Sequence, residues 1–308
     1  MFKKEKPDDF ITTACSIDLG SNSALILIGR EANGQIEVVY EDMRTTRLGE
    51  GVSETGKISI KAINRAIDTI STFKEAIKEH SVTEIHCIGT SALRCAENRK
   101  QVIDEIEKKT GIGVEVIDEE EEARLSFISA THSLNIEGRC IVLDVGSYSS
   151  QLSWGAGTEI EGTLSLPIGC LILRETFTDE EAGYDTYAIE SAIKDGIEDS
   201  GMKERADTLV LVGGSAVAGA SLLLGLSEYN RRVIHGISVG LDEMEDMAVS
   251  LALMSEDAIR QRMAFEPERA DIIVPGLIVI TRFMRVLDYN IARVSWWGLT
   301  YGMLVEIL

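Results

Sequence analysis

Two regions of the chain show the same order of apolar and polar segments. The first begins near residue 12 and predicts three consecutive strands, "ACSIDL", "ALILIG" and "IEVVYEDMR", which are separated by a Gly-Ser-Asn turn and by the turn "EANGQ". Apolar residues then recur at helical spacing from Ile60 to Ile77, and "EIHCIGT" is typical of a short buried strand. A helix ending at Gly111 and the strand "VEVID" complete a predicted β-β-β-α-β-α-β unit, and a further helix is predicted over residues 119–134.

The same order starts again at residue 139. The segment "RCIVLDVGSYSSQLSWGAGTEIEGTLSLPIG" predicts strand, glycine-serine turn, strand, turn and strand. A helix around residues 183–200, the strand "TLVLVGG" and the helix "AVAGASLLLG" follow, and helices are expected to dominate from residue 241. A duplicated α/β unit therefore predicts two domains, residues 1–128 and 129–308, with residues 299–308 returning to complete the first.

Composition and charge narrow the class of protein. The chain has 308 residues, of which 44% are hydrophobic and 26% charged, which is typical of a soluble globular protein. No apolar run reaches the roughly 18 residues that span a bilayer, and the start "MFKKEKPDDF" lacks the apolar core of a secretory signal, so we expect a cytoplasmic protein. A net charge of −21 argues against nucleic acid and anionic membranes as partners. The five cysteines are scattered and predict reduced thiols rather than disulfides.

The sequence Asp-x-Gly-Ser-x-Ser occurs twice, at the predicted end of the first strand of each copy. "DLGSNSAL" begins at Asp18 and "DVGSYSSQ" at Asp144, 126 positions later. Glycine in a tight turn lets the backbone approach a ligand, and the neighbouring N–H groups and serine hydroxyls can bind phosphate oxygens. The aspartate supplies a hard oxygen for Mg²⁺. One copy alone would be read as an ordinary hairpin turn, but duplication favours phosphate binding.

A third glycine site, "VGGSA" at residues 212–216, lies where a predicted strand meets a predicted helix. The start of a helix offers unpaired N–H groups to an anion, so Gly213, Gly214 and Ser215 are candidate phosphate contacts. A glycine-rich connector that is needed only for packing explains this site equally well.

Seven segments in order resemble the exopolyphosphatase and guanosine-pentaphosphate phosphatase (Ppx/GppA) family. They are "IDLGSNS", "TSALR", "TGIGVEVIDEEEEARL", "LDVGSYS", "SLPIGCLILRETF", "LVGGSA" and "ERADIIVPG". The resemblance implies the short two-domain type, an α/β fold of two ribonuclease-H-like domains of the acetate kinase, sugar kinase and actin superfamily, with an interdomain cleft. It also implies a metal-dependent phosphohydrolase that releases the terminal phosphate of inorganic polyphosphate or the 5′ phosphate of guanosine pentaphosphate.

The resemblance assigns roles to particular residues. Glu122, directly before Ala-Arg-Leu, corresponds to the catalytic base that activates water, and Arg94 to a basic residue that stabilises the transferred phosphoryl group. Asp144 and Asp18 would hold Mg²⁺, with Mn²⁺ as an alternative ion. The phosphate-contacting residues of the two turns would be Gly20, Ser21, Asn22, Ser23, Gly146 and Ser149. Composition alone does not separate Glu122 from the three preceding glutamates.

The chain departs from the family pattern in the second turn and near its end. The family's Gly-Gly-Gly-Ser-Thr-Glu is replaced by residues 146–151, in which Ser147 and Tyr148 stand for glycines and Gln151 for a glutamate. Glutamine lacks the charge that helps to bind Mg²⁺, so a catalytically weak sensor that binds polyphosphate or an alarmone is the alternative function. A phosphotransferase is disfavoured by Glu122. Trp296 and Trp297 replace charged residues and predict packing between domains or a homodimer contact.

Overall fold

The computed structural model describes residues 12–32, 34–176, 178–179, 183–202 and 205–308. Two compact units emerge, one formed by residues 1–116 together with 303–308 and the other by residues 117–302. The division lies between Val116 and Ile117, whereas the sequence pattern placed it after residue 128. The helix α5 (Glu119–Leu134) therefore belongs wholly to the second unit.

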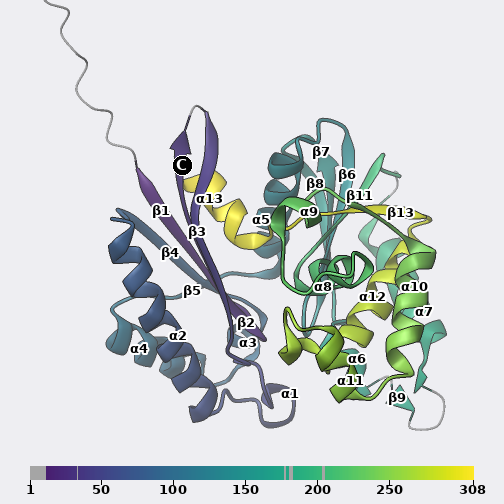
Figure 1. Ribbon diagram of the computed structural model, residues 1–308, viewed down its shortest axis with the longest axis horizontal. Helices are drawn as coiled ribbons and strands as arrows, with labels where there is room; N and C mark the ends of the chain where they lie inside the picture. The colour runs from purple at the N-terminus through teal and green to yellow at the C-terminus, as the bar shows by residue number, and fades with distance from the viewer. Residues whose placement is uncertain (1–11, 33, 177, 180–182, 203–204) are drawn as a thin grey trace, which may run out of the picture. The chain divides into compact units, whose positions relative to one another are not determined.

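The first unit is built on a five-stranded sheet in the order β3-β2-β1-β4-β5 (Figure 1). The strands are β1 (Thr13–Leu19), β2 (Ser23–Ala32), β3 (Gln35–Thr45), β4 (Glu84–Gly89) and β5 (Glu115–Val116). β1, β2 and β3 form an antiparallel meander, and β4 and β5 add in parallel. The helices are α1 (Val52–Thr55), α2 (Ile60–Glu79), α3 (Ser91–Cys95) and α4 (Arg99–Thr110). The predicted order of elements is confirmed in this unit, except that α1 was not predicted and that the helix predicted to end at Gly111 is divided into α3 and α4.

The core of the first unit follows from the alternation of side chains along its strands. Cys15, Ile17 and Leu19 of β1 face the cluster that contains the apolar stripe of α2. Ile60 was expected in that stripe but is 76% exposed, because it is the first residue of the helix. Asp18 lies on the opposite face of β1, since successive side chains of a strand alternate.

The second unit repeats this topology. Its six-stranded sheet has the order β12-β13-β11-β6-β7-β8, in which the last five strands mirror the first unit's sheet. The strands are β6 (Arg139–Val145), β7 (Ser150–Ala156), β8 (Glu159–Leu166), β11 (Thr208–Val212), β12 (Ser238–Gly240) and β13 (Ile291–Val294). β6, β11 and β13 run parallel, and β12 is antiparallel to β13. β9 (Thr178–Asp179) pairs with β10 (Gly183–Tyr184) in a separate two-stranded sheet.

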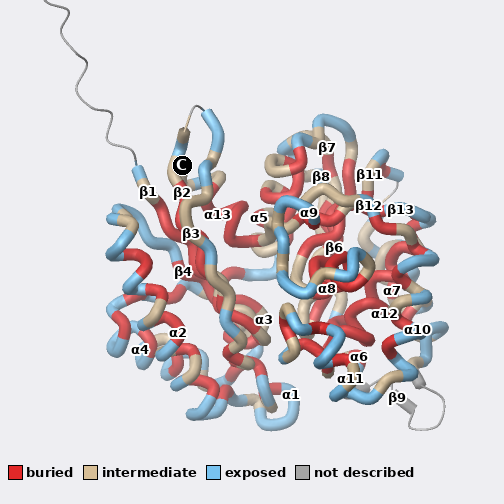
Figure 2. The backbone as a smooth tube through the Cα atoms, viewed as in Figure 1, coloured by how far each residue is buried: buried red, intermediate tan, exposed pale blue. Residues whose placement is uncertain are grey.

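Helices cover both faces of this second sheet. The helices of this unit besides α5 are α6 (Cys170–Thr176), α7 (Thr186–Ser200), α8 (Gly214–Leu223), α9 (Arg231–Ile234), α10 (Leu241–Ala252), α11 (Glu256–Arg262), the 3₁₀ turn Pro267–Arg269 and α12 (Ile273–Val286). The last helix, α13 (Leu299–Ile307), crosses the division, because residues 303–308 belong to the first unit. Ile141, Leu143 and Val145 face the larger core, whereas Cys140 and Val142 face α5. Figure 2 shows the central strands of each sheet as buried. The strand β13 lies where the sequence pattern predicted mainly helices.

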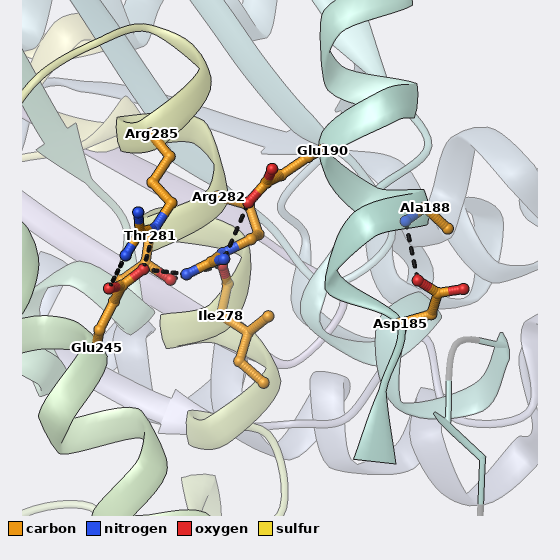
Figure 3. Close-up of polar contacts among 8 residues, drawn as sticks. All are labelled: Asp185, Ala188, Glu190, Glu245, Ile278, Thr281, Arg282 and Arg285. Atoms are coloured by element: carbon orange, nitrogen blue, oxygen red, sulfur yellow. Dashed lines mark hydrogen bonds and ion pairs between the residues drawn. The ribbon is translucent and has the colours of Figure 1, made fainter. Parts of the chain in front are cut away.

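An ion-pair network ties three helices of the second unit together (Figure 3). Arg282 of α12 donates to Glu190 of α7 at 2.9 Å and also to Glu245 of α10, which accepts from Arg285 as well. The Arg282 and Glu245 side chains are 15% and 18% exposed, so the network is better shielded from water than an ordinary surface pair. Among the helices of the described segments, none is long and apolar enough to cross a membrane.

Candidate active site

The two Asp-x-Gly-Ser-x-Ser segments form the same turn. Asp18 and Asp144 stand near the ends of β1 and β6, and a backbone hydrogen bond closes each following turn, from Gly20 N to Ser23 O at 3.0 Å and from Gly146 N to Ser149 O at 2.9 Å. A Cβ atom at either glycine would lie only 3.0 Å or 2.8 Å from the carbonyl oxygen that closes its turn. Glycine is required at both positions because the backbone carbonyl that closes the turn comes too close for a side chain.

Ser147 and Tyr148 fit the second turn without left-handed backbone. Neither has a positive φ angle, and neither does Gly146, so the backbone of this turn does not require glycine at positions 147 and 148. The amides of Cys170 and Leu171 at the start of α6 donate to the carbonyls of Gly146 and Ser147, at 3.0 and 2.8 Å. These bonds hold the turn in place while the Tyr148 side chain stays partly exposed.

Asp144 is the centre of the candidate site in the second unit. Side chains alternate along β6, so Asp144 lies on the same face as Cys140 and Val142, which is the face covered by α5. Ser126 Oγ of that helix donates a hydrogen bond to Asp144 Oδ2 at 3.0 Å. Burial raises the pKa of the Asp144 carboxyl, and the hydrogen bond from Ser126 acts in the opposite direction. Asp144 is itself partly exposed, so its carboxylate is accessible to a cation that would stabilise its charge.

The position of Glu122 on this helix distinguishes it from the three glutamates that precede it. Asp118 caps the helix by accepting from Glu121 N at 2.8 Å, and Glu121 itself accepts two hydrogen bonds from Arg124, at 2.7 Å each, which lower the pKa of Glu121. Glu122 lies four residues before Ser126, and residues at that spacing are neighbours on one helix face. Glu122 is thus on the face that contacts Asp144.

The Gly213–Gly214 turn lies beside Asp144 at the end of the adjacent strand. Val212 of β11 pairs with Asp144 of β6, so the turn that follows Val212 begins level with the carboxylate. Gly213 has φ 86° and ψ 168°, and a Cβ atom there would be 2.7 Å from Asp144 Oδ1. α8 starts at Gly214, so its free N–H groups also face this end of the sheet.

Two of the predicted phosphate-binding serines carry buried hydroxyls that lack a partner. Across the described residues, Ser21 Oγ and Ser215 Oγ make no hydrogen bond, and the two serines are 7% and 1% exposed. An unsatisfied buried hydroxyl costs about 1–3 kcal/mol, which a bound anion can recover. Ser23 and Ser149 are equally buried, and Ser149 Oγ accepts from Gln151 Nε2 at 2.7 Å.

The remaining candidates of the first unit lie at the ends of neighbouring strands. Asp18 pairs with Ile88 of the parallel strand β4, and the short helix α3 that follows this strand carries Arg94. Asn22 Nδ2 donates to Ser23 Oγ at 3.3 Å. The parallel alignment brings Asp18, the 20–23 turn and the segment with Arg94 to one edge of this sheet.

Sequence reasoning assigned no role to a buried ion pair behind the Gly213–Gly214 turn. Arg269 is 6% exposed and donates to Glu266 from Nε at 2.7 Å and from Nη2 at 3.1 Å, while Tyr229 donates to Glu266 at 2.5 Å. A Cβ on Gly214 would overlap the Arg269 guanidinium. The only signal in the sequence was the segment "ERADIIVPG", which was noted without a role for its arginine.

Comparison with known proteins identifies relatives over nearly the whole chain. A family model described as the Ppx/GppA phosphatase family matches residues 27–308. A guanosine-5′-triphosphate,3′-diphosphate pyrophosphatase of Aliivibrio fischeri strain MJ11 is 28% identical over 307 residues, covering 95% of this chain and 59% of its own length. The chain thus spans less than two thirds of that relative.

Solved structures show the same fold at matching length. The Aquifex aeolicus Ppx/GppA family member has a TM-score of 0.82 at 28% identity, with 96% of this chain and 97% of that one covered. An exopolyphosphatase from Cytophaga hutchinsonii has a TM-score of 0.87 at 23% identity, covering 96% and 97%, and supports the fold alone. The predicted fold class is confirmed.

Proposed function

Because the chain belongs to the Ppx/GppA phosphatase family, we propose that it is a metal-dependent hydrolase of phosphoanhydride bonds. It releases the terminal phosphate of inorganic polyphosphate or the 5′ phosphate of guanosine pentaphosphate. What supports this proposal is the hydrogen bond from Ser126, four residues after Glu122 on α5, to the partly buried Asp144. The name of the Aliivibrio relative supports the nucleotide as one substrate to test.

Glu122 serves as the general base in this proposal. Phosphoryl transfer to water needs a carboxylate that accepts the proton of the attacking water while the water lies in line with the scissile P–O bond. Glu121 is engaged by Arg124, and Glu119 and Glu120 are exposed at the helix start. Glu122 lies one helical turn before Ser126, the residue that hydrogen-bonds to Asp144.

The turns and the start of α8 bind the phosphate oxygens. Backbone N–H groups at Gly213 and Gly214 and the hydroxyl of Ser215 suit an anion at a helix N-terminus. In the first unit, Ser21 and Arg94 offer a hydroxyl and a guanidinium to a phosphate group. Such donors also stabilise charge that develops on the transferred phosphoryl group.

Asp144 fits Mg²⁺ or Mn²⁺ as an oxygen ligand, with Asp18 as the second candidate. The described residues contain no cluster of three or more acidic, histidine or cysteine side chains suited to a metal. Mg²⁺ keeps several waters and is commonly held by one or two carboxylates and the substrate phosphates, so a single, partly exposed aspartate fits this mode. The ion would neutralise the charge of the leaving phosphate.

A polyphosphate- or alarmone-binding sensor is the second candidate function. Gln151 is directly opposite Asp144 in the β6–β7 pair and is 3% exposed, so the position where the family carries a glutamate is next to the proposed ligand. A neutral amide there reduces the charge that is available to the cation. Tight binding with little hydrolysis would support this function.

Phosphate release from polyphosphate of defined length and from guanosine pentaphosphate, measured side by side with Mg²⁺ and with Mn²⁺, tests the proposal. Hydrolysis is expected with metal only, and Glu122→Gln should lower the rate about 10²–10⁴-fold without loss of substrate binding. Glu119→Gln, at the exposed start of the same helix, is the matched control. A Glu122→Gln variant with wild-type activity would remove the assigned base, and binding without release by the wild type would favour the sensor.

A further inference from the structure

Ser126 makes the hydrogen bond that fixes the Asp144 carboxylate. Among the described residues it is the one side chain that donates to Asp144, with Oγ 3.0 Å from Oδ2. Ser126 is 1% exposed, so water does not compete for this bond. The other carboxylate oxygen faces Gly213, where a Cβ atom would come within 2.7 Å of Oδ1. One oxygen is therefore held by a donor and the other is confined by the backbone.

The hydroxyls of α5 do not all behave in this way. A buried serine or threonine in a helix commonly donates to the carbonyl four residues earlier, and Thr131 does so to Phe127 O at 2.9 Å. Ser129 is fully buried, and its Oγ makes no hydrogen bond to any residue that the structure describes. Ser126 instead directs its hydroxyl out of the helix to β6. The Ser126 hydroxyl thus links α5 to β6, two elements of the candidate site.

We propose that Ser126 is a positioning residue that orients Asp144 for the divalent cation and couples it to the helix that carries Glu122. This inference rests on the proposed function, because it takes Asp144 as a metal ligand. Residues that hydrogen-bond to a metal ligand fix its orientation, and their removal commonly weakens metal affinity about 10- to 100-fold. Because Glu122 and Ser126 are neighbours on one helix face, the same bond also sets the distance between base and ligand.

The test uses Mn²⁺ binding to the intact protein, measured by electron paramagnetic resonance without substrate. The variants Ser126→Val and Ser126→Thr introduce side chains of nearly the same shape, of which only threonine carries a hydroxyl. We expect Ser126→Val to bind Mn²⁺ about 10- to 100-fold more weakly than Ser126→Thr. Ser129→Ala, one turn further along the helix, is the control for the loss of a buried hydroxyl and should bind as the wild type does.

Equal Mn²⁺ affinity of the valine and threonine variants would overturn the role of Ser126, as would no binding by the wild type. Thermal unfolding of each variant shows that it is folded. Phosphate release, measured on the same samples, separates this inference from the proposed function. If the wild type binds Mn²⁺ and the valine variant binds it more weakly than the threonine variant, but the wild type releases no phosphate, then the proposed hydrolase function is refuted and the positioning role of Ser126 is supported.

Discussion

Gly213 is the position at which one added methyl group tests both the backbone and the site. It joins β11 to α8 with φ 86° and ψ 168°, a region of backbone conformation that is essentially restricted to glycine. Gly213→Ala therefore introduces strain of about 1–3 kcal/mol before any contact is considered. The new Cβ would also lie 2.7 Å from Asp144 Oδ1, where ordinary contact begins at 3.4 Å.

The strain predicts a measurable loss of stability. For a domain of about 150–250 residues, each kcal/mol lowers the melting temperature by roughly 2–4 °C, so the second unit should melt about 2–12 °C lower in Gly213→Ala. The contact predicts a separate loss of function. Because Ser126 holds one oxygen of Asp144, the carboxylate must tilt to clear the methyl group, and Mn²⁺ affinity and phosphate release should fall together.

Gly157→Ala is the matched control for this variant. Gly157 also has a positive φ, 58°, but no atom of the described part of the chain lies within 4 Å of a Cβ atom there. An alanine in left-handed backbone costs about 1–2 kcal/mol, so this variant should lose stability but keep its Mn²⁺ affinity. Differential scanning calorimetry and Mn²⁺ titration compare the two. Wild-type Mn²⁺ affinity in Gly213→Ala would refute the placement of the metal at Asp144.

Four further changes have expected outcomes. The metal-free Asp144→Asn variant should be more stable than the metal-free wild type at pH 7. Burial raises the pKa of the Asp144 carboxyl, so the wild type loses stability as the pH rises through that pKa and the carboxyl ionises, whereas the asparagine does not ionise. Urea unfolding of both proteins in the presence of a chelator, at pH 5 and at pH 8, checks this. Gln151→Glu should tighten Mn²⁺ binding and raise the rate of phosphate release, and an unchanged rate would count against metal-limited activity. Glu266→Gln should cost about 3–5 kcal/mol in urea unfolding, because Arg269 stays buried without its partner. A thiol reagent should label Cys95 quickly in the native protein and all five cysteines only after denaturation, since the other four are buried.

The duplicated fold was predictable because its signals are local. Short apolar strands and the turns between them are predicted from a few consecutive residues, and two copies of one sequence pattern predict two copies of one topology. The backbone bonds at Gly20 and Gly146 show how closely the copies agree. β13 was missed because its four residues, Ile291–Val294, become a strand only through pairing with β11 and β12.

The candidate site was predictable only in part. The glycine turns and the carboxylates were found from motifs, but Ser126 and Arg269 act through partners that are distant in sequence or through the packing of a turn. Trp296 and Trp297 were expected to pack between domains or copies. Within the second unit, Trp296 lies edge-on to Tyr229 at 5.5 Å, and Trp297 stacks on Tyr301 at 5.3 Å.

Gln151 changes what the other residues of the site must do. A glutamate at this position would oppose the partly buried Asp144 directly across the β6–β7 pair, and like charges in that arrangement destabilise a sheet unless a cation lies between them. The glutamine avoids this repulsion and uses its amide to donate to Ser149 in the proposed phosphate-binding turn. The metal-free fold gains stability, while the proposed cation would have one charged neighbour fewer. Under the proposed metal site, the orientation of Asp144 would then matter more for metal binding than it would in a site with two carboxylates, and the hydrogen bond from Ser126 would set that orientation.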